Sequence, residues 1–149
     1  MKQYITRYVT GAFFLLFVCF TSCSIETDGT GGLDGYWHLE KVDTVETGGS
    51  TDLSEQLLFW SFQVHLMETN DRDGKYRSML FRFERNESLL RLYEPRLNDA
   101  AAGDPLTDDL SYLTPFGINA TEDTFTIEQS SNSRMTLYNG ILRLYFKKM

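Results

Sequence analysis

The sequence contains few side chains of the types that catalyse reactions or bind metals. Its two histidines are His38 and His65, and Glu68 follows the second at a spacing that would suit a metal pair on a helix. In a β-strand, however, His65 and Glu68 would point to opposite faces. No cysteine follows position 23, so a zinc site is not expected. We interpret both histidines as exposed strand residues.

Carboxylates gather in one later stretch, at Asp99, Asp104, Asp108 and Asp109. Such a group could activate water in a hydrolase, or bind calcium through oxygen ligands. No EF-hand spacing accompanies it, and no nucleophile elbow, phosphate loop or dinucleotide turn occurs in the chain. We therefore interpret the stretch as a solvated acidic loop. The sequence predicts neither an enzyme nor a metal site, and no cofactor.

Cys23 is the residue for which the sequence predicts a definite modification. Lys2 and Arg7 precede an apolar run from Ala12 to Phe20, which is typical of a secretory signal peptide and too short to cross a bilayer. The following Phe20-Thr21-Ser22-Cys23 resembles a bacterial lipobox, although Leu is usual in place of Phe20. Cleavage before Cys23 and its acylation, with palmitate among the chains, would make a lipoprotein. The alternative is an ordinary signal peptide cut near Ser22.

This reading divides the chain into a signal peptide (residues 1–22), a flexible tether (23–34) and one domain (35–149). The lipid anchor predicts a location at the outer membrane, on its periplasmic face or at the cell surface. Because Cys19 leaves with the signal peptide and Cys23 is acylated, no disulfide is expected. The processed chain would carry 12 basic and 21 acidic residues, a net charge of −9. Nucleic acid is therefore not an expected partner.

The domain is predicted to be all-β, with seven or eight antiparallel strands. Alternating apolar and polar residues mark strands at 35–42, 57–69, 76–84, 88–93, 124–128, 134–138 and 141–147. Asn139-Gly140 is a strong hairpin signal. The lapse of the pattern over 94–119 predicts a long loop with a short helical cover. Neighbouring strands of this kind must pair or cover their edges, which favours a closed barrel.

The alternation also predicts which side chains face the barrel interior. In the longest stretch, Leu58 to Leu66, the inward set includes Val64 and Leu66. The interior would contain the aromatic side chains of Trp60, Phe62, Phe81, Phe83, Phe125 and Phe146. These residues could line a pocket for a small apolar ligand at the barrel mouth. Alternatively they fill the interior, since an eight-stranded barrel is only just wide enough for its own side chains.

Gly35-Tyr36-Trp37 on the first strand resembles the Gly-x-Trp motif of lipocalins. With the strand number and the lipobox, the chain looks like lipocalin-like lipoproteins of Gram-negative anaerobes. The resemblance implies an up-and-down barrel in which Trp37 closes one end and a basic residue of the last strand, Arg143 or Lys147, stacks on it. It also implies a binding module for a small apolar ligand. The alternative is an interaction lipoprotein that acts through its exposed loops on an unknown protein partner.

Overall fold

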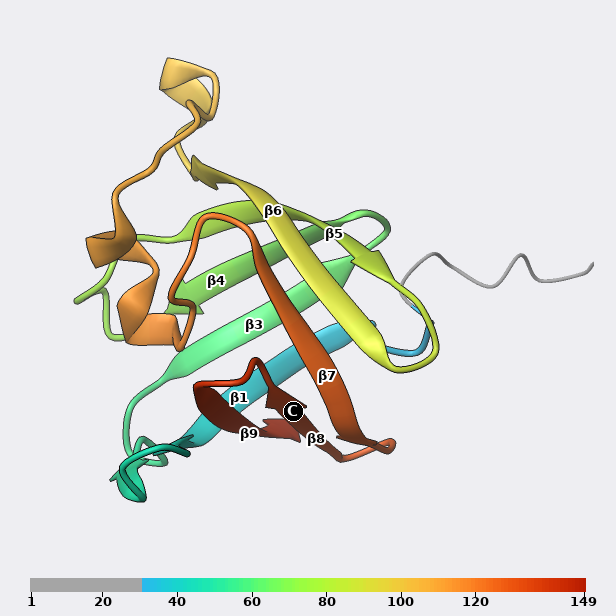
Figure 1. The fold of residues 1–149 in the computed structure, drawn as a ribbon. Coiled ribbons are helices and arrows are strands. Elements are labelled where there is room, and N and C mark those ends of the chain that lie inside the picture. Colours follow the sequence, from blue (N-terminus) through green and yellow to red (C-terminus); the bar gives the residue numbers. More distant parts are fainter. Residues whose placement is uncertain (1–30) are drawn as a thin grey trace, which may run out of the picture.

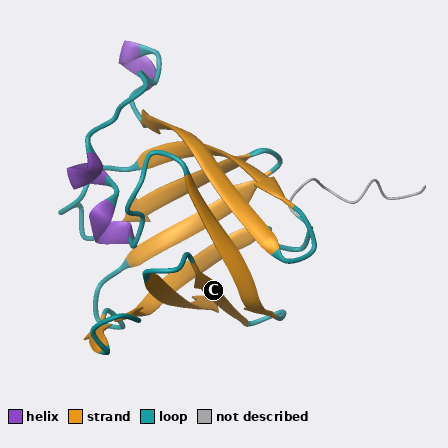
Figure 2. Cartoon of the chain, viewed as in Figure 1, coloured by secondary structure: helices purple, strands orange, loops and turns teal. Residues whose placement is uncertain are grey.

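The computed structural model describes residues 31–149, so the predicted signal peptide, Cys23 and most of the predicted tether lie outside the described residues. The strands are β1 (Gly35–Thr44), β2 (Gly49–Asp52), β3 (Leu58–Gln63), β4 (Leu66–Asp71), β5 (Met79–Arg85), β6 (Leu89–Leu97), β7 (Asp123–Ser130), β8 (Arg134–Tyr138) and β9 (Leu142–Lys148). Three 3-10 helices, η2 (Ala100–Ala102), η3 (Leu110–Tyr112) and η4 (Thr114–Phe116), all lie between β6 and β7 (Figure 2).

The strands form one antiparallel sheet that closes on itself. From β3 to β9 each strand pairs with its neighbour in the sequence, and β1 pairs with both β3 and β9. Eight strands, β1 and β3 to β9, therefore make a closed barrel, while β2 is a short strand paired with β1 (Figure 1). This confirms the predicted fold class. Closure leaves the barrel strands without a free edge, apart from the places where neighbouring strands diverge.

Alternation along the strands places the large apolar side chains inside. Trp60 and Phe62 of β3, Phe81 and Phe83 of β5, and Phe125 of β7 all belong to one buried cluster. On β9, Leu144 and Phe146 face the same core, while Arg143, Tyr145 and Lys147 do not belong to it. The period of two in the sequence thus sets the inner and outer faces of the wall.

The long strand predicted over 57–69 is wrong, because the chain reverses at Val64-His65. Phe62 pairs with Met67 and Trp60 with Thr69 across this hairpin. Residues directly opposite in an antiparallel pair lie on the same face, so Met67 and Thr69 point inward. Val64 and Leu66, which were predicted to be buried, are 59% and 49% exposed. A two-residue turn without Gly or Asn gave no signal in an unbroken alternating pattern.

Other boundaries also differ from the prediction. Part of the expected Gly48–Ser50 loop is strand β2. Strand β6 continues through Pro95 to Leu97, where a loop was expected. The expected helical cover over 110–119 is confirmed as η3 and η4, and the side chains of Leu113, Phe116 and Ile118 in this segment are fully buried. Leu33, placed in the tether, is also fully buried.

Candidate functional site

The six aromatic residues predicted to face the interior are all buried, with exposures between 0 and 5%. Trp60 lies at their centre. Its ring centroid is 5.0 Å from that of Phe146, 5.7 Å from Phe125 and 6.4 Å from Phe62. Phe62 in turn meets Phe83 edge-to-face at 5.2 Å. Separations of this kind are those of aromatic rings in direct contact, so these side chains pack on one another.

One end of the barrel, which we call the tether end, is closed by Trp37. Its indole Nε1 donates a hydrogen bond of 2.7 Å to the carbonyl oxygen of Leu33, and both residues are fully buried. The ammonium group of Lys148 lies 5.1 Å from the centroid of the Trp37 ring. The register places Lys148 directly opposite Trp37. The expectation that Arg143 or Lys147 stacks on Trp37 is therefore wrong, and Lys148 takes that position.

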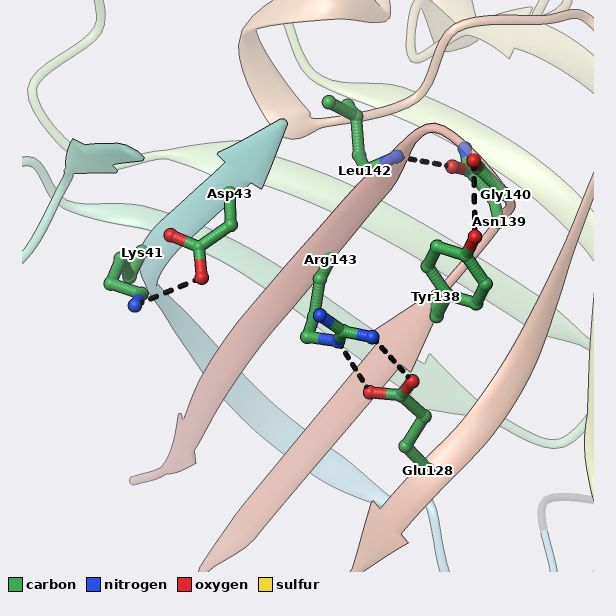
Figure 3. A network of polar contacts seen from close by, with 8 residues as sticks. All are labelled: Lys41, Asp43, Glu128, Tyr138, Asn139, Gly140, Leu142 and Arg143. Carbon is green, nitrogen blue, oxygen red and sulfur yellow. Dashed lines mark hydrogen bonds and ion pairs between the residues drawn. The ribbon is translucent and has the colours of Figure 1, made fainter. Parts of the chain in front are cut away.

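Arg143 instead belongs to a polar network on the outside of the wall (Figure 3). It pairs with Asp43 of β1 and Tyr138 of β8 in the register, five positions before Lys148. Its guanidinium makes two hydrogen bonds to Glu128, of 2.7 and 2.9 Å, and lies 5.1 Å from the Tyr138 ring centroid. The hydrogen bonds from Arg143 hold the pKa of Glu128 below its usual value, against the opposing effect of burial. This two-point ion pair joins β7 to β9 across β8.

The other end, the lid end, is closed by η3 and η4. The indole Nε1 of Trp60 donates a hydrogen bond of 3.2 Å to the carbonyl oxygen of Phe116, and so ties η4 to the barrel centre. Gly117 ends η4 with a φ of +79°. A Cβ at this position would lie 2.6 Å from Cδ2 of Leu144. The cover is therefore packed directly against the interior side chains, and glycine is required at the point of contact.

A hollow of about 810 Å³ opens on the outside of the barrel near the lid end. Strands β6 and β7 pair only from Leu89 to Leu92. Beyond Leu92 they diverge, and β6 is joined instead to the segment before η3, through an Arg96↔Leu106 bridge. The hollow lies in this gap and is lined by Arg91, Tyr93, Glu94, Pro95, Leu106, Thr107, Asp108, Thr121 and Glu122. We call it the β6–β7 groove.

The charges in the β6–β7 groove are mostly paired with one another. Arg91 bridges Glu84 and Glu122 at 3.0 and 2.9 Å, and these two carboxylates raise its pKa, with Glu122 the larger cause. Glu94 contacts two arginines of the wall, Arg82 at 3.4 Å and Arg96 at 3.7 Å. Among residues 31–149, Asp108 forms no ion pair. Leu106 beside it is 59% exposed. The groove therefore presents an apolar side chain and an excess of negative charge.

Several carboxylates of the acidic stretch next to the groove accept hydrogen bonds from nearby residues. Asp99 accepts hydrogen bonds from the backbone N–H of Ala102 and from Arg77. Asp109 accepts one from Ser111 N–H, and hydrogen bonds from the side chain and the backbone of Ser111 lower the pKa of Asp109. Asp104 accepts from Asp99 N–H at 2.8 Å. In the part of the chain that the structure describes, no three His, Cys or carboxylate side chains are grouped to hold a metal.

The prediction that His38 is exposed is wrong, since only 9% of it reaches solvent. Its Nε2 lies 2.8 Å from the carbonyl oxygen of Gln56, and its ring stacks on Phe59 at 5.0 Å. Phe59 points outward but is covered from the other side by Arg72, at 4.7 Å. His65 lies in the exposed β3–β4 turn. The two histidines lie near opposite ends of β3, so they do not form one site.

The closed barrel with a tryptophan at one end and a cover at the other defines the class of lipocalin-like proteins. Residues 18–149 match the model of the lipocalin-like domain family. The chain therefore belongs to the lipocalin-like domain family. A search of curated proteins gave no match.

Two solved structures share the fold. One is a lipocalin-like protein from Bacteroides uniformis, with 21% identity and a TM-score of 0.60, covering 80% of this chain and 100% of that one. The other is an uncharacterized protein from Bacteroides eggerthii, with 20% identity and a TM-score of 0.59, covering 78% of this chain and 99% of that one. At these identities the likeness establishes the fold alone. Within residues 31–149, no helix is long and apolar enough to span a bilayer.

Proposed function

We propose that this chain is a lipid-anchored interaction protein, in which the barrel is a packed scaffold and the β6–β7 groove binds a protein partner. The observation that carries the proposal is the packing of the interior. All six aromatic residues that could have lined a ligand pocket contact one another or are fully covered, and the lid is hydrogen-bonded to the central Trp60. These contacts support an interior filled by the chain's own side chains, whereas a hollow of about 810 Å³ is available outside.

The partner that fits the groove best is an extended polypeptide segment with basic side chains. Leu106 offers an apolar contact, and Asp108 next to it is a carboxylate without an ion pair within residues 31–149. The connection over 98–122 contains five acidic residues and no lysine or arginine. Opposite charge would favour such a segment and raise its association rate. Loops placed by a rigid scaffold commonly carry binding surfaces in this way.

Carriage of a small apolar ligand inside the barrel is the second candidate. It is favoured by the lid, which separates the interior from solvent with two short elements, η3 and η4, held to the barrel centre by the hydrogen bond of Trp60. Opening of η3 and η4 would expose Phe116 and the central rings. The two candidates differ in what the purified protein should contain.

Native mass spectrometry of the full protein, extracted from its own host's membranes in mild detergent, tests the scaffold. We expect the processed polypeptide with acyl chains on Cys23 and no further small molecule. A ligand that is released on denaturation would favour the carrier instead. A polypeptide cut near Ser22 and without acyl chains would overturn the anchor. The presence or absence of a bound ligand would still distinguish the carrier from the scaffold.

The groove is tested by placing a photo-crosslinking amino acid at Leu106 in cells. Ile141, which is 54% exposed at the same end of the barrel, provides the matched control position. We expect one discrete crosslinked partner from position 106, none from position 141, and loss of the crosslink when Asp108→Lys is added. Equal crosslinking from both positions would contradict a specific groove.

A further inference from the structure

The β3–β4 turn presents two apolar side chains to solvent in a strained conformation. Val64 is 59% exposed and Leu66 is 49% exposed. Val64 also has a φ of +55°, in the left-handed region that a β-branched residue rarely adopts. Glycine or asparagine would fit this backbone without an exposed apolar group. An outlier of this kind is a reason to look for a function that the side chain serves.

The N-terminal segment enters the barrel beside this turn. Gly35 pairs with Phe62, two residues before Val64. Leu33 is fixed in the tether end by its hydrogen bond to Trp37, and Gly31 lies against the side chain of Arg85 at the β5–β6 turn. The described chain therefore begins at the end that carries both turns (Figure 1). Cys23 is eight residues before Gly31, a span of at most about 29 Å when fully extended.

The two ends of the domain also differ in charge. At the tether end, residues 31–36, 62–67, 82–89, 130–134 and 147–149 contain five basic and three acidic residues. At the lid end, residues 45–57, 71–78, 98–122 and 139–141 contain three basic and ten acidic residues. A surface rich in anionic lipid would attract the first end and repel the second. The net negative charge of the domain is thus concentrated away from the anchor.

We propose that the tether end is a membrane-docking surface. Val64 and Leu66 enter the interface of a bilayer that contains anionic phospholipid, while the exposed basic group of Lys147 faces the lipid phosphates. Arg82 lies directly opposite Leu66 in the β4–β5 register, and its side chain is 61% exposed, although its guanidinium already contacts Glu94 at 3.4 Å. The proposal rests on the anchor at Cys23, because one acyl anchor and a short tether hold this end next to the bilayer. Docking would direct the β6–β7 groove away from the membrane.

Fluorescence quenching measures the contact directly. The full lipidated protein, purified from its host, is reconstituted in vesicles of phosphatidylcholine and phosphatidylglycerol with brominated acyl chains. Leu66→Trp places a reporter at the proposed interface, and Ile141→Trp places one of similar exposure at the lid end. After subtraction of the signal of Trp37 and Trp60, we expect the Leu66→Trp reporter to be quenched at least twofold more than the control. Equal quenching would overturn the docking surface.

Two further readouts separate the apolar and charged contributions. Addition of Val64→Asn to Leu66→Trp removes an apolar side chain but suits the positive φ, so the fold is kept while quenching should fall by about half. Vesicles without phosphatidylglycerol should lower it as well, because the basic groups then lose their counter-charge. Quenching that is unchanged by both would contradict the proposal.

The same samples distinguish failure of docking from failure of the anchor. Acyl chains on Cys23 in the intact mass, together with equal quenching at positions 66 and 141, would reject docking and keep the anchor. A mass without acyl chains would reject the anchor. In that case, stronger quenching at position 66 in protein added to preformed vesicles supports docking, and equal quenching rejects it.

Discussion

The two ends of the barrel are closed in different ways. At the tether end, short turns join the strands and Trp37, Leu33 and Lys148 close the opening through contacts between β1, β9 and the entering chain. At the lid end, the connections are long, and a separate segment with η3 and η4 folds over the core. The comparison shows that the strand register alone closes the tether end, whereas closure of the lid end needs an additional packed segment.

The difference has a consequence for function. At the tether end the contacting residues cannot vary independently of the barrel, because pairing of β1 with β9 places Lys148 opposite Trp37. A closure made by an added segment can vary in length and sequence while the barrel is kept, and such segments are where binding residues concentrate. In this chain the groove, the acidic excess and the lid all lie at the second end, and the entering N-terminal segment and the basic excess lie at the first.

Removal of a large buried side chain from the lid should have the largest effect on stability. Phe116→Ala deletes the fully buried ring of η4 in the lid and should lower the free energy of unfolding by about 3–5 kcal/mol. The cavity beside Tyr76 should then take up a fluorescent fatty acid that the unmodified protein does not bind. Urea unfolding and probe titration check both results. Equal uptake by the unmodified protein would show that the lid end already contains a usable cavity.

A methyl group at the lid contact should have the next largest effect. Gly117→Ala places a Cβ within 2.6 Å of Leu144 and also strains a φ of +79°, so we expect a loss of about 2–3 kcal/mol. Gly140→Ala is the matched control, because its φ is +92° but nothing lies within 4 Å of the added carbon. It should lose only about 1 kcal/mol of backbone strain. Equal losses would mean that packing of the lid adds nothing to the cost.

The sequence predicts the wall of this barrel better than its ends. Alternation identifies Trp60, Phe125 and Phe146 as interior residues, and Asn139-Gly140 marks the last hairpin, because both signals are local. The Val64-His65 reversal has no such signal. The partner of Trp37 depends on the β1–β9 register, which pairs it with Lys148, more than a hundred positions away in the sequence. The expectation taken from the lipocalin resemblance therefore named Arg143 or Lys147 instead of Lys148.

The β6–β7 groove, too, could be predicted from the sequence only in part. Asp108 of the groove belongs to an acidic cluster that is visible in the sequence, and the use of its neighbours Asp99 and Asp109 as local caps agrees with a solvated loop. The hollow itself arises because β6 continues through Pro95 while β7 diverges from it after Leu92. Proline has no N–H for a sheet partner, so its place in a strand favours an edge that is left open. The negative charge of the groove can be predicted from the composition, but its shape depends on which strands pair and where they diverge.

Relief of strain at the tether end should have a smaller and opposite effect. Val64→Asn replaces a β-branched residue at a φ of +55° with one that tolerates it, and should raise the free energy of unfolding by about 0.5–1 kcal/mol. Ile141→Asn, which also removes an exposed apolar side chain, should change it by less than about 0.5 kcal/mol. Thermal and urea unfolding measure the pair. A loss of stability in Val64→Asn would mean that the exposed valine contributes packing to the fold.

The wall between the two ends should show the smallest effect, as a pH dependence. The pKa of Glu128 is lowered in the folded state by its bonds to Arg143, so the ion pair stabilises the fold above the ordinary carboxylate pKa. This contribution is lost as the pH falls through the lowered folded-state value. With each side chain 32% exposed, the ion pair should contribute at most about 1 kcal/mol to the stability.

The melting temperature of Glu128→Gln should thus lie below that of the unmodified protein at pH 7 and converge with it toward pH 3. Glu46→Gln, at an exposed site in the β1–β2 turn, should match the unmodified protein throughout. A Glu128→Gln difference that persists at pH 3 would assign the loss to packing and remove the ion pair as its cause.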